Sequence, residues 1–172
     1  MWRLKQIIGS ALLVALVANQ PLAQDWDKYK PRTLKQITSE LAEASFKDPD
    51  VVIVDEKKSE STVLSHDTFP SVVTVVYTGS SRKVSDKKKE VIAAWLKVFQ
   101  RPPEYLNLFE NEYLFTEDGK EYWLPVQAQV ASYFERELRK SDKVNLFAVW
   151  VGARRDSAGT EHVFLVNEFE KQ

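Results

Sequence analysis

The sequence predicts an α+β domain in which three helices pack on an antiparallel sheet of about five or six strands, with barrel-like closure as a further possibility. Three observations support this prediction. Segments with a helical pattern and segments with a strand pattern do not follow one another in strict one-to-one alternation along the chain. Asp118-Gly119 lies between two aromatic-rich runs, which is typical of a β-hairpin. Residues 143–152 are apolar on both faces, as in a strand that is covered on both sides or closed into a barrel.

The first 23 residues have the pattern of a secretory signal peptide. Arg3 and Lys5 precede an apolar run at residues 7–18, and the small residue Ala23 comes before a polar segment. A membrane-spanning helix needs about 20 apolar residues, and this run is shorter. We therefore expect cleavage after Ala23, which leaves a single periplasmic or secreted domain at residues 24–172.

Composition restricts the class of protein. Removing Arg3 and Lys5 leaves 22 of the 24 basic residues against 25 acidic residues, a net charge of −3, which does not favour nucleic-acid binding. The chain has no cysteine, so disulfides, thiol nucleophiles and thiolate metal sites are excluded. In an exported protein, this absence favours a bacterial envelope over eukaryotic secretion.

The first part of the expected domain contains an arm, a helix and a strand. Residues 24–32 are polar and have no period, which indicates an exposed arm. Thr33 and Gln36 have the spacing of a capping box, and Asp48 with the following proline ends the helix that they begin. The apolar run at residues 51–54 is typical of a short buried strand.

The middle of the chain is predicted to form a strand, a turn, a return strand and a helix. Residues 72–77 are mostly β-branched or aromatic and favour a strand, and Gly79 marks the turn. Residues 82–85 would return as a short partner strand. A helix capped by Ser85 or Asp86 then follows, with its apolar residues on one face.

The last part of the chain is predicted to form a hairpin, a helix and a second hairpin. The first hairpin spans residues 112–126, and the helix spans about residues 127–140. Residues 143–152 form the central strand and pair with residues 162–169, joined by a loop at residues 153–161. A helix, a polar turn and a long strand in this order resemble the way in which the chain enters small OB- or SH3-like barrels, a likeness too short to identify a family.

The two histidines each stand beside an acid, in His66-Asp67 and Glu161-His162. A general base requires histidine and carboxylate side chains that converge in space, and the spacing here matches no metal motif. No glycine-rich nucleotide loop is present, and we predict no cofactor. A group of acidic residues around the first hairpin is interpreted as a solvated loop: Glu110, Glu112, Glu117, Asp118 and Glu121.

Two basic clusters are candidates for binding. Lys87, Lys88 and Lys89 stand in the expected first turn of a helix, where the helix dipole favours acids. Such a violation of a local rule sometimes marks function. Arg154 and Arg155 follow the central strand, in the expected loop. A solvated face is the favoured interpretation of the lysine cluster, and the two arginines otherwise mark where the chain leaves the core.

Tyr122 and Trp123 complete the candidate binding residues. Exposed aromatic side chains on a sheet suit sugars or peptides, although in strands they more often belong to the core. The leading hypothesis is a non-enzymatic exported domain with a binding or assembly role in the bacterial envelope, whose partner is a protein or another envelope component. The alternatives are a small hydrolase that uses His66 or His162 with nearby carboxylates, and a small-ligand carrier with an aromatic-lined pocket.

Overall fold

A computed structural model describes residues 26–172, except for the side chain of Trp26. The predicted signal peptide and its cleavage site lie outside the described residues. Within the described part of the chain, no helix combines the length and the apolar character needed to cross a membrane.

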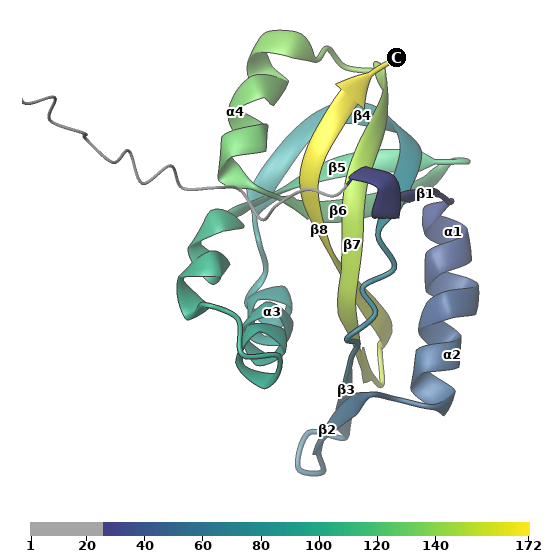
Figure 1. Cartoon of the computed structure of the whole chain (residues 1–172), viewed down its shortest axis with the longest axis vertical. Coiled ribbons are helices and arrows are strands. Elements are labelled where there is room, and N and C mark those ends of the chain that lie inside the picture. Colours follow the sequence, from purple (N-terminus) through teal and green to yellow (C-terminus); the bar gives the residue numbers. More distant parts are fainter. Residues whose placement is uncertain (1–25) are drawn as a thin grey trace, which may run out of the picture.

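One mixed sheet of eight strands forms the body of the molecule (Figure 1). The order across the sheet is β1-β4-β5-β6-β8-β7-β3-β2, and β4 also pairs with β7. This extra pairing closes β4, β5, β6, β8 and β7 into a five-stranded barrel. The strands are β1 (Lys30–Pro31), β2 (Val51–Asp55), β3 (Glu60–Leu64), β4 (Ser71–Lys83), β5 (Asn111–Glu117), β6 (Lys120–Val126), β7 (Lys143–Asp156) and β8 (Gly159–Lys171).

The barrel has the connectivity of the OB-fold. Along the chain its strands follow in the order β4, β5, β6, β7, β8. Around the barrel the order is β4-β5-β6-β8-β7, and β7 pairs with β4 to close the ring. β6 and β8 are parallel and pair only through Val126 and Val166, whereas the other barrel pairings are antiparallel and longer. The barrel is therefore partly open along the β6–β8 seam, as is common in this fold.

The predicted three helical segments are present around the barrel. The first is continuous and consists of α1 (Leu34–Gln36), a π-helix (Ile37–Leu41) and α2 (Ala42–Lys47). The other two are α3 (Asp86–Val98) and α4 (Ala128–Glu137), the latter between the third and fourth barrel strands. Short 3-10 helices occupy Trp26–Lys28 and Pro103–Leu108. Figure 1 places α1 and α2 on one side of the barrel and α3 on the other.

Local capping explains where these helices begin. Thr33 and Gln36 form the predicted capping box, and the side chain of Ser85 accepts a hydrogen bond from the backbone N–H of Lys88. The hairpin turn is also as predicted: Asp118 and Gly119 both have positive φ, +50° and +79°. The α4 helix ends at Glu137, before the predicted boundary at Lys140.

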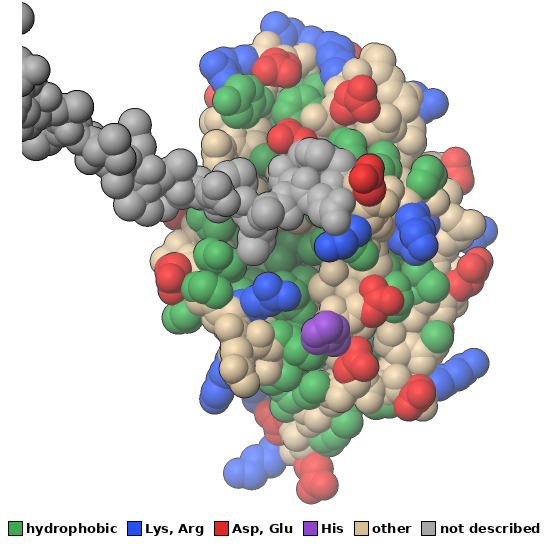
Figure 2. All heavy atoms as spheres, in the orientation of Figure 1, with side chains coloured by type: hydrophobic (Ala, Val, Ile, Leu, Met, Phe, Trp, Pro, Cys, Tyr) green, Lys and Arg blue, Asp and Glu red, His purple; other side chains and the backbone are tan. Residues whose placement is uncertain are grey.

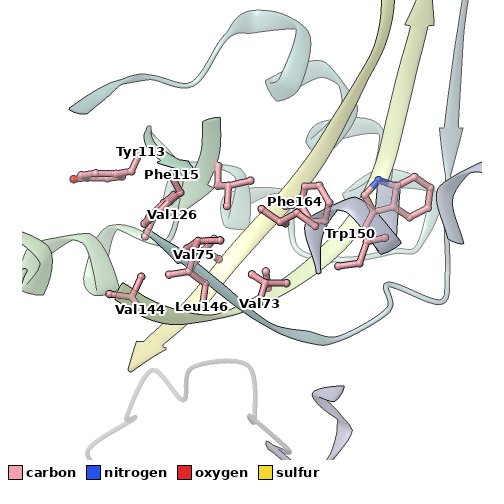
Figure 3. Close-up of a cluster of buried hydrophobic side chains, with 14 of the residues drawn as sticks. Val73, Val75, Tyr113, Phe115, Val126, Val144, Leu146, Trp150 and Phe164 are labelled. Atoms are coloured by element: carbon pink, nitrogen blue, oxygen red, sulfur yellow. The ribbon is translucent and has the colours of Figure 1, made fainter. Parts of the chain in front are cut away.

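The core lies in two layers that share β7. Val144, Leu146, Ala148 and Trp150 face the barrel interior, where side chains from several strands meet (Figure 3). Val151 and its partly buried neighbour Val149 belong to a second cluster, between the barrel wall and α3. The prediction that this strand is covered on both faces is therefore confirmed, and so is its pairing with residues 162–169.

The sheet is larger than the five or six strands predicted. β3 was not predicted, and residues 30–31 of the expected irregular arm pair with β4 as β1. The turn predicted at Gly79 is wrong: β4 runs through it, and Gly79 has a φ of +82° beside an irregularity in the pairing with β5. A bulge of this kind lets one long strand bend around a barrel.

Two further predictions were wrong. The run at residues 51–54 forms β2, but as an exposed edge strand and not a buried one. Arg154 and Arg155 lie within β7 and not in a loop, because β7 and β8 extend to a tight turn at residues 157–158.

Candidate functional site

Three of the predicted binding residues meet at a hollow between β6 and β8, which we name the seam hollow. It has a volume of about 250 Å³. Its lining comes from the first helical segment, β4, α3 and the two seam strands: Thr38, Arg82, Lys88, residues 120–124, residues 160–162 and Phe164. Lys88, Tyr122 and Trp123 were predicted as binding residues, and His162 as a possible catalytic residue.

Strand geometry explains the position of the hollow. The β6–β8 pairing is limited to Val126 and Val166, and the lining residues precede this pair in both strands. Thr38 lies in the π-helix, where its hydroxyl donates to the carbonyl of Leu34 at 2.9 Å. Single turns of π-helix are rare and frequently occur at functional sites.

A buried ion pair lies beside the hollow. Lys88 is 4% exposed and Glu112 is fully buried, and their Nζ and Oε2 atoms are 2.5 Å apart. Lys88 Nζ also donates to the carbonyl of Trp123 at 2.7 Å, and Arg82 Nε donates to Glu112 Oε1 at 2.6 Å. The unfavourable lysine in the first turn of α3 is thus explained, because its side chain neutralises a carboxylate of the barrel wall.

Two cations lie over aromatic rings of β6. The guanidinium of Arg82 is 4.0 Å from the centroid of the Trp123 ring, and Lys120 Nζ is 5.1 Å from the centroid of the Tyr122 ring. These contacts orient both rings and both charges. The Arg82 side chain remains half exposed, so its terminal nitrogens can meet a ligand.

His162 contributes a neutral imidazole. Burial lowers its pKa from 6.5 to about 4, although the nearby Glu43 carboxylate acts in the opposite direction. Its Nδ1 atom is buried and has no hydrogen-bond partner within residues 26–172.

Two carboxylates also belong to the lining. Glu121 is exposed and Glu161 is partly buried, and both line the seam hollow. The hollow therefore presents hydrogen-bond donors, acceptors and aromatic rings together.

A catalytic arrangement of the two histidines is not formed. His66 packs on Phe99 with 5.5 Å between ring centroids, whereas His162 packs on Trp150 at 6.4 Å. Across the described residues, neither imidazole hydrogen-bonds to a carboxylate, and no group of three or more His, Asp or Glu could hold a metal ion.

Three of the four remaining predicted binding residues form ion pairs between elements. Arg154 lies between Glu60 and Glu90, with 2.6 Å to the latter, and joins β7 to β3 and α3. Lys87 pairs with Asp156 at 2.9 Å, and Arg155 pairs with Glu43 at 2.8 Å. Lys89 is partly buried and does not line the seam hollow.

The acidic group around the hairpin is not a solvated loop throughout, so that interpretation is corrected. Glu112 forms the buried pair with Lys88, and Glu117 accepts hydrogen bonds from the backbone N–H groups of Leu34 and Lys35. Two further cations of the lining, Arg82 and Lys120, were not among the predicted binding residues. One signal was present: Glu112 directly precedes the apolar and aromatic run Tyr113-Leu114-Phe115, where a buried charge needs a partner.

One other hollow is less suited to an anionic ligand. A hollow of about 320 Å³ between α4 and β8 has two carboxylates, Glu137 and Glu168, but no cation in its lining. In the face drawn in Figure 2, acidic and basic side chains are interspersed and form no continuous basic surface.

Comparison with known proteins adds no identification: no family model, no curated protein and no solved structure matches the chain. The candidate site is therefore interpreted from its own geometry.

Proposed function

We propose that the protein is a non-enzymatic binding domain of the bacterial envelope and that its seam hollow binds an anionic sugar. The observation that carries this proposal is the convergence of three cations and two aromatic rings on one hollow. Location in the envelope follows from the signal-like pattern of residues 1–23.

The cations argue for an anionic group on the ligand. Arg82 has two terminal nitrogens beyond its bond to Glu112, and Lys88 uses two of its three N–H donors in its hydrogen bonds to Glu112 and Trp123. Lys120 is exposed and contacts the Tyr122 ring. A carboxylate or phosphate would accept charge-assisted hydrogen bonds from these groups.

The rings and carboxylates argue for a sugar. Tyr122 and Trp123 are consecutive residues of β6 and point to opposite faces of the strand, so one of the two rings offers apolar surface to the C–H face of a pyranose ring. Glu121 and Glu161 offer acceptors for sugar hydroxyls. A volume of about 250 Å³ suits a single ring better than a drug-sized molecule.

The position of the hollow agrees with the fold at the level of analogy. OB-fold barrels commonly bind oligosaccharides or oligonucleotides beside their second and third strands and the adjacent loops. The seam hollow lies along the third barrel strand, β6, next to the β7–β8 turn. Fold alone does not establish function, so this agreement supports the site and not the ligand.

Calorimetric titration of the mature chain with monosaccharides tests the proposal. We expect glucuronate to bind more tightly than glucose, and glucose more tightly than glucosamine, because the cations attract the C6 carboxylate of glucuronate, glucose is neutral, and the cations repel the C2 ammonium of glucosamine. Lys120→Gln should weaken glucuronate binding about tenfold, which corresponds to the loss of one charge-assisted hydrogen bond.

Lys89→Gln is the matched control, since it removes a neighbouring cation that does not line the hollow. It should leave the affinity for glucuronate unchanged. Equal affinity for the three sugars, or no binding at all, would contradict the proposal. So would a Lys120→Gln variant that binds as tightly as the wild type.

A further inference from the structure

A second surface of the molecule combines exposed apolar side chains with a free strand edge. β2 is the last strand of the sheet and pairs only with β3 among the described strands. Val52, Ile53 and Val54 are 50%, 43% and 61% exposed. In Figure 1 the β2–β3 hairpin extends beyond the barrel, at the end opposite α4.

Such an edge is a template for another strand. Edge strands present unpaired N–H and C=O groups, and soluble proteins usually protect them with charges, proline, bulges or a covering element. Here four consecutive apolar residues, Val51 to Val54, occupy the edge strand. An exposed sheet edge of this kind is the feature to which an extended peptide binds when it adds a strand to a sheet.

Charges at both ends of the strand select the partner. Asp50 precedes the strand and accepts hydrogen bonds from Ser65 and His66, and Asp55 is its last residue and pairs with Lys58 at 3.6 Å; both aspartates remain exposed or partly exposed. If a second copy added in the antiparallel register that matches all four apolar residues, Val51 would face Val54 and Asp50 would face Asp55 at each end. Like charges directly opposite each other destabilise a strand pair, so this arrangement disfavours self-association.

We propose that β2 binds an extended segment of another protein in which a basic residue stands at each end of four apolar residues. In the antiparallel register, the two basic side chains would face Asp50 and Asp55, and the apolar side chains would cover Val52, Ile53 and Val54. This site is separate from the seam hollow and does not depend on its ligand.

Fluorescence anisotropy with labelled peptides tests this inference. The probes are two soluble peptides with the same core, Val-Ile-Val-Val, flanked on both sides by arginine in one and by glutamate in the other. The arginine peptide should bind at least about tenfold more tightly, since two opposite-charge pairs replace two like-charge pairs. Val54→Ser should weaken its binding, whereas Val98→Ser, at an exposed apolar residue of α3, should not.

Asp55→Lys provides a second readout that does not depend on apolar contact. It should reduce or abolish the preference for the arginine peptide, with circular dichroism used to confirm that each variant is folded. Equal binding of the two peptides would overturn the inference, as would unchanged binding by Val54→Ser. Sedimentation that showed a wild-type dimer lost on Val54→Ser would overturn it in favour of a second copy.

Discussion

His162 and Lys88 show two ways of burying a basic side chain at the same hollow. Lys88 forms an ion pair with Glu112, with 2.5 Å between Nζ and Oε2. His162 is neutral because burial lowers its pKa to about 4. The charge of the site at neutral pH is therefore provided by lysine and arginine, while the imidazole remains a neutral hydrogen-bonding group.

The lowered pKa of His162 predicts a pH dependence of stability. Its pKa is 6.5 in the unfolded reference and about 4 in the folded protein, so between these values the unfolded chain binds more protons. The free energy of unfolding should therefore fall as pH is lowered from 6.5 towards 4, by up to about 3 kcal/mol from this group. Urea unfolding of the wild type and of His162→Phe between pH 7 and 4.5 measures the effect.

The His162→Phe variant should lose most of this slope, and His66→Gln should retain it because His66 is exposed. A His162→Phe variant with the wild-type slope would show that the imidazole is not the titrating group. The range stops at pH 4.5 because Asp142 and Asp156, whose pKa values are lowered by Lys171 and Lys87, titrate below it.

At the scale of elements, the first helical segment is held at its N-terminus by two different caps. The local one, the Thr33–Gln36 capping box, was predicted because it is visible as a spacing. The distant one is Glu117 of β5, whose carboxylate oxygens accept from Leu34 N at 2.8 Å and Lys35 N at 2.9 Å. No local pattern indicates that pairing, since 82 or more residues separate the partners.

Glu117→Ala should destabilise the protein by about 1–3 kcal/mol, because two helix N–H groups lose a charged acceptor in a buried place. Thermal or urea unfolding measures this change. Glu110→Ala, an exposed acid that pairs with Lys83, is the control and should change stability by less than about 0.5 kcal/mol. Equal effects of the two substitutions would show that Glu117 does not act as a cap.

The elements predicted from sequence are those whose signals are local. The Asp118-Gly119 hairpin, the caps of two helices and the two-faced strand β7 were all predicted correctly. β2 was assigned to the core because an apolar run looks the same in a buried strand and at an exposed edge. Gly79 was interpreted as part of a turn because glycine is common in turns. A glycine with positive φ is equally compatible with a β-bulge, and the sequence alone does not distinguish the two.

At the scale of the whole molecule, barrel closure assembles the candidate site. Lys88, Tyr122 and Trp123 were predicted individually from their types and positions, but their meeting with Arg82, Glu112 and His162 was not. These residues come from β4, α3, β5, β6 and β8. The β4–β5 and β5–β6 pairings join three of these strands and place Arg82 opposite Glu112, and barrel closure through the β4–β7 pairing and the short β6–β8 contact adds β8. Long-range topology of this kind leaves no periodic signal in one sequence.

An NMR titration of the mature protein with glucuronate tests the central claim most directly. The indole N–H of Trp123 and the imidazole of His162 report on the two sides of the seam hollow. We predict that both signals shift together and saturate, while backbone signals of β2 stay fixed. Shifts confined to the hollow between α4 and β8, around Gln127 and Glu168, or no saturable shift in either reporter, would contradict the account.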